Sequence, residues 1–230
     1  MKKTQATRES HEQKRQRARE VMDRLLLDHP EPKIALHFET PYQLLIATIL
    51  SAQCTDERVN KTTPALFALA PDAASMSKLG LAKIKQAIKS INFFNNKAEN
   101  ILKCSLLLVS RHGGEVPRTL DDLVALPGVG RKTANVVMND AFGEPGIVVD
   151  THVTRLANRL GFVSRETDAV KIEFALQKLI EVDRWSKTAH LLILHGRQTC
   201  KALKPDCERC ALVDLCPSAF KKADAWKPPS

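Results

Sequence analysis

Apolar residues recur along this chain at the spacing of α-helices, and polar residues fill the faces between them. Over residues 15–27, Val21, Leu25 and Leu26 fall on one side and Arg and Lys on the other, which predicts an amphipathic helix. Residues 44–50 are apolar nearly all round, as in a buried helix. Further helices are predicted over 81–91, 97–111, 120–126, 131–142, 151–160, 167–182 and 185–195. Since alternating, strand-like runs are scarce, the pattern predicts an all-α protein of about ten helices.

Capping residues and helix breakers sharpen these bounds. Thr40 is placed to cap a helix whose first residue is Pro41, and Gln43 stands where a capping box requires it. Residues 92–96, which include two Phe between Asn residues, are expected to form a loop. Breaks at 29–32 and 143–146, rich in Pro or Gly, are candidate domain boundaries.

The net charge of +9, from 35 Lys and Arg against 26 Asp and Glu, narrows the possible partners. Such a charge favours a polyanion, either nucleic acid or an anionic membrane surface. The longest apolar run, Leu44 to Leu50, is too short to cross a membrane. The charged residues 1–20 lack the apolar core of a secretion signal. Charge alone does not distinguish a nucleic-acid-binding protein from a merely basic one.

A glycine-rich turn between two predicted helices is the first candidate site. It reads Leu126-Pro127-Gly128-Val129-Gly130, and the next helix begins at Arg131. Two glycines one residue apart let the backbone adopt left-handed angles and approach another backbone closely. Consecutive N–H groups beside a helix N-terminus form a cradle for an anion such as a DNA phosphate. A tight helix–helix turn with glycine as its cap explains the same residues.

Lys132 and Asp150 are the candidate reactive side chains. Lys132 lies in the first turn of the helix after the glycine-rich turn, where the helix dipole disfavours a cation. The dipole, and burial if present, would lower the amine pKa from ~10.4 and favour nucleophilic attack. A lysine that contacts phosphate is the simpler alternative. Asp150 follows the apolar run 147–149, and from spacing alone a helix cap is favoured over a catalytic carboxylate.

Four of the six cysteines gather near the end of the chain, at Cys200, Cys207, Cys210 and Cys216. Their spacing, C-x6-C-x2-C-x5-C, indicates a metal or cluster site in a reducing compartment rather than a disulfide framework. Four thiolates suit an iron–sulfur cluster or zinc. Zinc sites typically use two C-x2-C pairs, and only one is present here. The spacing therefore favours the cluster, with zinc as the alternative. Cys54 and Cys104 are predicted to be packed thiols.

Several segments carry a familiar pattern when taken in order. They are Leu50–Asp56 (LSAQCTD), Asn95–Asn100 (NNKAEN), Leu126–Asn135 (LPGVGRKTAN), Val149–His152 (VDTH), Leu194–Arg197 (LHGR) and the four clustered cysteines. Together they resemble endonuclease III, the bifunctional DNA glycosylase of the helix-hairpin-helix superfamily. An ordered match across most of the chain is far more specific than any single motif.

The resemblance implies a two-lobed, all-α fold with a DNA cleft between the lobes. Residues 34–144 would form a six-helix barrel that carries the helix-hairpin-helix motif. Residues 145–230 would form a helical lobe with a [4Fe-4S] cluster loop, and residues 1–33 a basic tail and a helix packed on that lobe. The four cluster ligands would be Cys200, Cys207, Cys210 and Cys216, and the cluster would be structural and DNA-contacting.

The resemblance also implies an activity on double-stranded DNA that contains oxidised pyrimidines or abasic sites. The damaged nucleotide would be flipped out of the duplex. Lys132 would then attack C1′, assisted by Asp150, and displace the base. The resulting Schiff base would permit β-elimination, which nicks the strand 3′ to the abasic site. The resemblance further implies a monomeric bacterial enzyme of the cytoplasm without a membrane partner.

The DNA contacts implied by the resemblance come from both sides of the cleft. Gln53 would fill the space left by the flipped base. Phe93 would wedge into the base stack, at a position where the family often has Leu, and an aromatic ring there could gain ~1–3 kcal/mol by stacking. The remaining contacts would be Gly128, Val129, Gly130, Thr151 and His152.

Two other functions fit part of the pattern. An adenine-mismatch glycosylase of the same superfamily also carries a cluster, but it uses a glutamate from an early barrel helix, and residues 41–53 contain no Glu. A non-catalytic helix-hairpin-helix DNA-binding module with a structural metal is the alternative from another class. It would need neither Lys132 nor Asp150 specifically.

Overall fold

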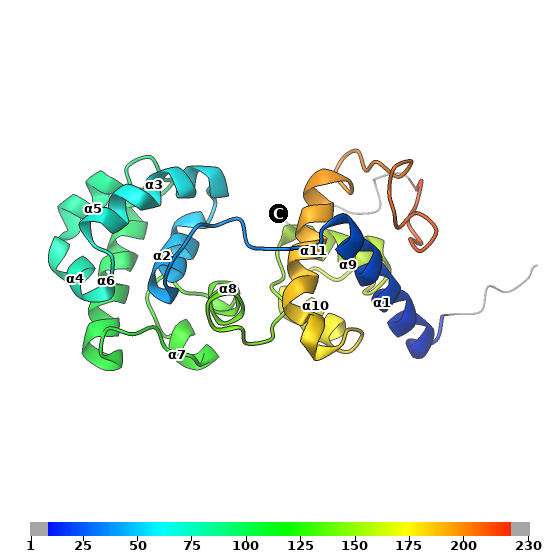
Figure 1. The fold of residues 1–230 in the computed structure, drawn as a ribbon, viewed down its shortest axis with the longest axis horizontal. Helices are drawn as coiled ribbons and strands as arrows, with labels where there is room; N and C mark the ends of the chain where they lie inside the picture. Colours follow the sequence, from blue (N-terminus) through cyan, green and yellow to red (C-terminus); the bar gives the residue numbers. More distant parts are fainter. Residues whose placement is uncertain (1–8, 222–230) are drawn as a thin grey trace, which may run out of the picture. The chain divides into compact units, whose positions relative to one another are not determined.

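The computed structural model describes residues 9–221, and within that range it contains α-helices, one short 3₁₀ helix (η1) and no strand. The elements are α1 (His11–Asp28), α2 (Pro41–Ser51), α3 (Asp56–Leu69), α4 (Ala73–Leu79), α5 (Leu81–Ala87), α6 (Phe94–His112), α7 (Leu120–Val124), α8 (Arg131–Phe142), α9 (Thr151–Arg159), α10 (Ala169–Gln177), η1 (Val182–Arg184) and α11 (Trp185–Gln198). This confirms the all-α fold class (Figure 1).

The described chain divides into two compact units. Residues 34–146 form one unit, which we call the hairpin unit because it contains the glycine-rich turn. Residues 9–33 and 147–221 belong to the other, which we call the cysteine unit. The basic tail that the sequence analysis places at the N-terminus lies largely outside the described residues.

Helix α2 is the core of the hairpin unit. Residues 42–50 are all buried, and α3, α6 and α8 pack around the helix (Figure 1). Thr40 caps it as predicted, accepting a hydrogen bond from the Gln43 N–H at 3.2 Å. The Gln43 side chain accepts from the Glu39 N–H at 2.8 Å, one residue earlier than a capping box requires. A buried hydrogen bond of 2.7 Å between the Tyr42 and Ser105 hydroxyls joins α2 to α6.

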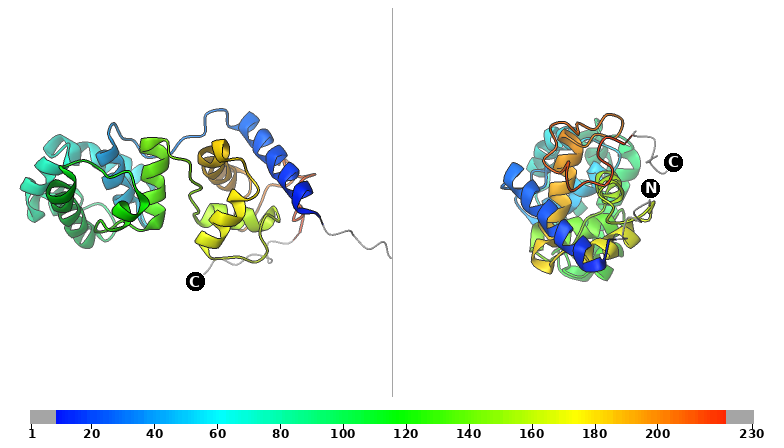
Figure 2. Two further views of the ribbon diagram at one scale, coloured as in Figure 1. Left: turned by 90° about the horizontal axis from the view of Figure 1, so that it is seen from below. Right: turned by 90° about the vertical axis from the view of Figure 1, so that its right-hand side faces the viewer.

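The cysteine unit is built on α11, which packs against α1 and α9. Residues 199–221 follow it without any α-helix, and they run beside α1 (Figure 2). Arg17 on α1 donates to the Leu215 carbonyl at 3.3 Å and to the Leu160 carbonyl at 2.6 Å. Arg24, also on α1, pairs with Asp214. Side chains of α1 therefore hold this segment in place.

Several helix bounds differ from the prediction; α5, for example, ends at Ala87 rather than at residue 91. Helix α1 begins at His11, not at residue 15, because Ser10 and Gln13 form a complete capping box. Helix α6 begins at Phe94, so only the first part of the expected loop 92–96 is a loop. Helix α10 ends at Gln177 rather than near residue 182, where η1 begins instead.

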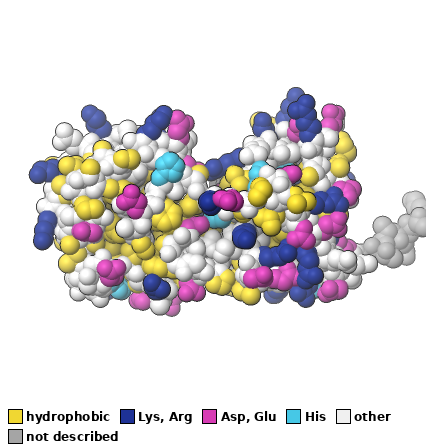
Figure 3. Space-filling view, viewed as in Figure 1, with side chains coloured by type: hydrophobic (Ala, Val, Ile, Leu, Met, Phe, Trp, Pro, Cys, Tyr) yellow, Lys and Arg dark blue, Asp and Glu magenta, His cyan; other side chains and the backbone are white. Residues whose placement is uncertain are grey.

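No helix in residues 9–221 is long and apolar enough to cross a membrane. On the face shown in Figure 3, Lys and Arg side chains occur on both units, with acidic side chains among them. Some of the arginines of the described chain are neutralised by ion pairs, such as Arg19 with Glu181 and Arg184 with Asp23.

Candidate active site

The glycine-rich turn joins α7 to α8 and is shaped mainly by Gly128. This residue has a φ of +81°, in the region that favours glycine. A Cβ at this position would lie 2.9 Å from the Asn100 Cβ of α6, so glycine is also required sterically. Gly130 has a φ of −93° and open space around it. The expectation that both glycines supply left-handed angles was therefore wrong for Gly130.

Gly130 instead leaves the start of α8 open. It is the N-cap residue, and within the described chain no side chain forms the capping bond there. The first N–H groups of a helix have no partner inside the helix. Val129 is 6% exposed and packs inward, while its N–H donates to the Leu126 carbonyl at 3.1 Å. The turn thus leads into a helix start that has no side-chain cap, an arrangement that suits an anion.

Lys132 is the second residue of α8, and its side chain is exposed. The hairpin unit does not bury this amine. The neighbouring open helix start can hold a phosphate, and an incoming strand would lie within one turn of the amine.

Asp150 caps α9, which confirms the interpretation favoured from spacing. Its Oδ1 accepts from the His152 N–H at 2.8 Å and from the Val153 N–H at 2.9 Å. No described residue supplies a hydrogen bond to Oδ2. The preceding run, residues 147–149, is buried, while Asp150 itself is partly exposed. The carboxylate is thus anchored through one oxygen and available through the other.

The two residues after Asp150 differ in their surroundings. Thr151 is exposed. His152 is half-buried, and its Nδ1 lies 3.1 Å from Arg155 Nη2. Burial lowers the pKa of Arg155, whose guanidinium also donates to the Gly196 carbonyl at 2.9 Å. The His152 ring therefore contacts the protein interior on at least one side.

Gln53 and Phe93 lie on two loops that touch. Gln53 has a φ of 52° and Phe93 a φ of 57°, and both are non-glycine residues in the left-handed region. Both side chains are exposed, Phe93 by 64%. The Asn92 side chain donates to the Gln53 carbonyl at 2.8 Å and so ties one loop to the other. A solvent-open pocket with about 610 Å³ of empty space lies beside them, lined by Gln53, Cys54, Thr55, Arg58 and Asn92.

The four clustered cysteines line one pocket with about 400 Å³ of empty space. Apolar walls come from residues such as Leu156 and Leu212, and polar contacts come from α9 and α11. Arg159 Nη1 lies 3.3 Å from Cys200 Sγ, and His195 Nε2 lies 3.5 Å from Cys210 Sγ. The Cys216 thiol lies 3.6 Å from the Arg159 carbonyl.

Burial changes the titration of the groups around this pocket. It raises the pKa of the Cys210 and Cys216 thiols and lowers the pKa of His195 to about 4. A cation bound among the thiols would reverse the effect on them, because it favours the thiolate. Within the described chain no three His, Cys, Asp or Glu side chains are close enough to hold a single metal ion.

The other two cysteines are separate from this pocket. Cys104 is fully buried on α6, and burial raises the pKa of its thiol to about 12. This confirms that it is a packed thiol. Cys54 is only half-buried and faces the pocket beside Gln53.

This fold and its hairpin define a class of protein. The profile of the HhH-GPD superfamily of base excision DNA repair proteins matches residues 46–182, more than half of the chain. A thermostable thymine-DNA glycosylase of known structure is similar, with a TM-score of 0.81, 25% identity and coverage of 90% of this chain and 98% of that one.

Closer relatives narrow the class. Endonuclease III of Synechocystis sp. is 49% identical over 207 residues, which cover 90% of this chain and 94% of that protein. Endonuclease III of Escherichia coli K12 is 47% identical over 197 residues, covering 86% and 93%. The structure of a trapped endonuclease III–DNA covalent intermediate matches with a TM-score of 0.85, 43% identity and coverage of 90% and 97%. The chain belongs to the endonuclease III family.

Proposed function

We propose that this protein is a base excision repair DNA glycosylase that removes oxidised pyrimidines and then cleaves the strand 3′ to the abasic site. The observation that carries the proposal is the exposed Lys132 in the first turn of α8, directly after a helix start that has no side-chain cap and suits a DNA phosphate. Membership of the endonuclease III family supports the same reaction.

In this proposal Lys132 is the nucleophile. Its neutral amine forms a bond to C1′ of the flipped nucleotide, and the bond from C1′ to the base breaks with its electron pair leaving on the base. Loss of a proton and opening of the sugar ring give a Schiff base. This imine acidifies C2′, so removal of a C2′ proton expels the 3′ phosphate and cleaves the strand. The free side chain of Lys132 suits attack, and bound DNA would supply the desolvation that favours a neutral amine.

Asp150 would assist by proton transfer and charge stabilisation. The Oδ1 atom is occupied by two backbone N–H groups, whereas Oδ2 has no donor among the described residues. The carboxylate can therefore face the substrate without leaving its cap. Of the proposed DNA contacts, Gln53, Phe93, Gly128, Gly130 and Thr151 are exposed. Val129 is buried and its N–H is already bonded to Leu126, while His152 is partly engaged by Arg155.

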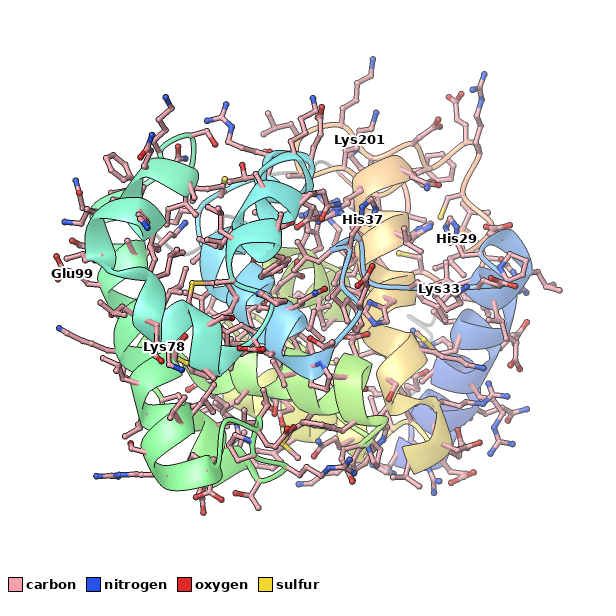
Figure 4. All side chains as sticks on the ribbon, turned by 60° about the vertical axis from the view of Figure 1, so that its left-hand side comes forward. His29, Lys33, His37, Lys78, Glu99 and Lys201 are labelled. Carbon is pink, nitrogen blue, oxygen red and sulfur yellow. The ribbon has the colours of Figure 1, made fainter. Side chains whose placement is uncertain are left out.

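Cys200, Cys207, Cys210 and Cys216 would hold a [4Fe-4S] cluster. The donor set fits, because four thiols face one largely apolar pocket and an arginine lies beside the first of them. A cluster spreads its ligands more widely than one ion does, which agrees with thiols that converge on one pocket but do not close around a single metal. When bound, the cluster would fix the loop that carries Lys201, an exposed residue labelled in Figure 4, for contact with DNA. The hairpin unit and the cysteine unit would then act as barrel and cluster lobes.

Borohydride trapping tests the reaction. With a duplex that contains thymine glycol, the wild-type protein should form a covalent complex stable to denaturation, because borohydride reduces the Schiff base. Lys132→Gln should abolish trapping and lower strand cleavage by at least about a thousandfold, as expected for loss of a nucleophile. Lys103→Gln, an exposed lysine of α6, is the matched control and should trap normally. Trapping by Lys132→Gln would place the nucleophile elsewhere.

A further inference from the structure

The backbone between α2 and α3 ends in an unusual turn. The chain leaves α2 after Ser51, and Gln53 adopts left-handed angles that are sterically unfavourable for a non-glycine residue. Phe93, on the neighbouring loop, adopts the same angles. Such conformations persist only where the surrounding structure determines them. The contacts that hold these two residues are therefore informative.

Each carbonyl of residues 50–53 has a specific donor. Lys97 Nζ donates to the Leu50 carbonyl at 2.8 Å and to the Ala52 carbonyl at 2.6 Å. The Cys54 N–H donates to the Ser51 carbonyl at 3.0 Å. The Asn92 side chain donates to the Gln53 carbonyl at 2.8 Å. Two of these donors, Asn92 and Lys97, come from the loop and helix that carry Phe93.

Lys97 forms hydrogen bonds to Phe93 and to Ala52, the residue before Gln53. Its backbone N–H donates to the Phe93 carbonyl at 3.1 Å and forms the first hydrogen bond of α6. Its ammonium group binds the carbonyls on either side of Ser51. The residue is 6% exposed, and burial lowers the pKa of its amine. A buried ammonium is costly unless its protons are matched, so these carbonyls fix where the side chain can go.

We propose that Lys97, together with Asn92, is a positioning residue that fixes Gln53 and Phe93 as one preformed probe for damaged DNA. This inference rests on the proposed function, which assigns Gln53 and Phe93 to the space and stack around a flipped nucleotide. Both loops are then ordered before DNA binds, so the free-energy cost of ordering them does not reduce the affinity for DNA. The pocket beside Gln53 leaves its side chain free to enter the duplex while its backbone stays fixed.

The alternative is that Lys97 only caps the end of α2 and stabilises the fold. If Lys97 were only a cap, its substitution would lower the stability of the protein. Any loss of DNA binding would then be the same whichever side chain stands at position 53. Positioning predicts instead that the effect of Lys97 passes through Gln53. The two roles therefore differ in their coupling, which a double-mutant cycle measures.

The experiment uses the full-length protein and a duplex with 2-aminopurine opposite a stable abasic-site analogue. The fluorescence of 2-aminopurine rises when a protein side chain disrupts its stacking on the neighbouring bases. Lys97→Met should weaken binding to this duplex roughly tenfold, the factor expected from losing a held left-handed turn, and should reduce the fluorescence change. Binding to an undamaged duplex should stay the same. Lys103→Met, the same change at an exposed position of α6, should alter neither measurement.

The cycle is completed with Gln53→Ala and the double variant. In the Gln53→Ala background, Lys97→Met should change binding by no more than about twofold. An equal loss in both backgrounds, or an equal loss on undamaged DNA, would overturn the proposal. If Lys97→Met does not fold, the exposed Asn92→Ala takes its place, with an expected loss of about threefold from one hydrogen bond that Gln53→Ala should also suppress. A Gln53→Ala protein that binds the damaged duplex normally would refute the assigned role of Gln53 itself, and Lys132 trapping would still test the reaction separately.

Discussion

In the hairpin unit an apolar helix holds the structure together, whereas in the cysteine unit arginine side chains hold residues 199–221 in place. Helix α2 is buried from Tyr42 to Leu50. By contrast, Leu212 is the one buried hydrophobic residue among the described residues 199–221. There, Arg159 donates to the carbonyls of Lys201 at 2.8 Å and Ala202 at 2.6 Å.

This contrast between apolar burial and polar contacts shows which interactions stabilise each part of the molecule. Burial of apolar side chains contributes roughly 25 cal/mol per Å² without any ligand, so the hairpin unit can hold its shape by itself. A segment with few buried apolar contacts depends on polar ties and, where present, on metal or cluster ligation. Residues 199–221 should therefore respond to loss of the proposed cluster much more than the hairpin unit does.

The largest effect is expected from Cys210→Ser. The protein should lose its iron and its absorbance at about 400 nm, and residues 199–221 should become sensitive to protease while the hairpin unit stays resistant. Limited proteolysis followed by mass spectrometry measures both units in one sample. The control is Cys54→Ser, which removes a thiol of the hairpin unit and should leave the absorbance unchanged. A colourless wild-type protein that contains zinc would contradict the cluster.

A smaller effect is expected from Gly128→Ala in the hairpin unit. The φ of +81° and the approach to the Asn100 Cβ should lower the free energy of unfolding by about 1–3 kcal/mol. Gly130→Ala is the matched control: with a φ of −93° and open space around it, it should cost less than about 1 kcal/mol. Denaturant unfolding gives both values, and equal losses would show that the close approach to α6 is unimportant.

The smallest effect should come from Tyr42→Phe, which removes the hydrogen bond to Ser105 from the buried core. Ser105 keeps its own bond to the Ile101 carbonyl at 2.8 Å, so the loss should be about 1 kcal/mol. Thermal unfolding at fixed pH tests this. A loss several times larger would mean that polar contacts, and not only apolar packing, hold α2 in the hairpin unit.

Local chemistry made much of the fold predictable. Thr40 and Pro41 predicted the start of α2, and Asp150 was recognisable as a helix cap. The start of α6 could not be placed in the same way, because Phe93 adopts left-handed angles beside Asn92, whose side chain binds a segment about forty residues away. Sequence spacing does not encode such contacts.

The candidate site shows the same division. Lys132, Asp150 and the cysteines stand in motifs that can be recognised in the sequence, and their roles stay predictions. Lys97 lies within one of the recognised segments, yet nothing in the sequence marks it as a donor to carbonyls of α2. Buried lysines are uncommon, and only the structure shows that this one is buried and matched.

The two oxygens of Asp150 have a consequence for mutational work. An asparagine at this position could keep the cap by turning its carbonyl oxygen towards the N–H groups of His152 and Val153. Its amide nitrogen would then occupy the place of Oδ2 and present hydrogen atoms where the carboxylate presents lone pairs. Asp150→Asn would thus preserve the helix and invert the polarity of the exposed edge, so that a folded protein of normal stability would meet the substrate with a donor in place of an acceptor.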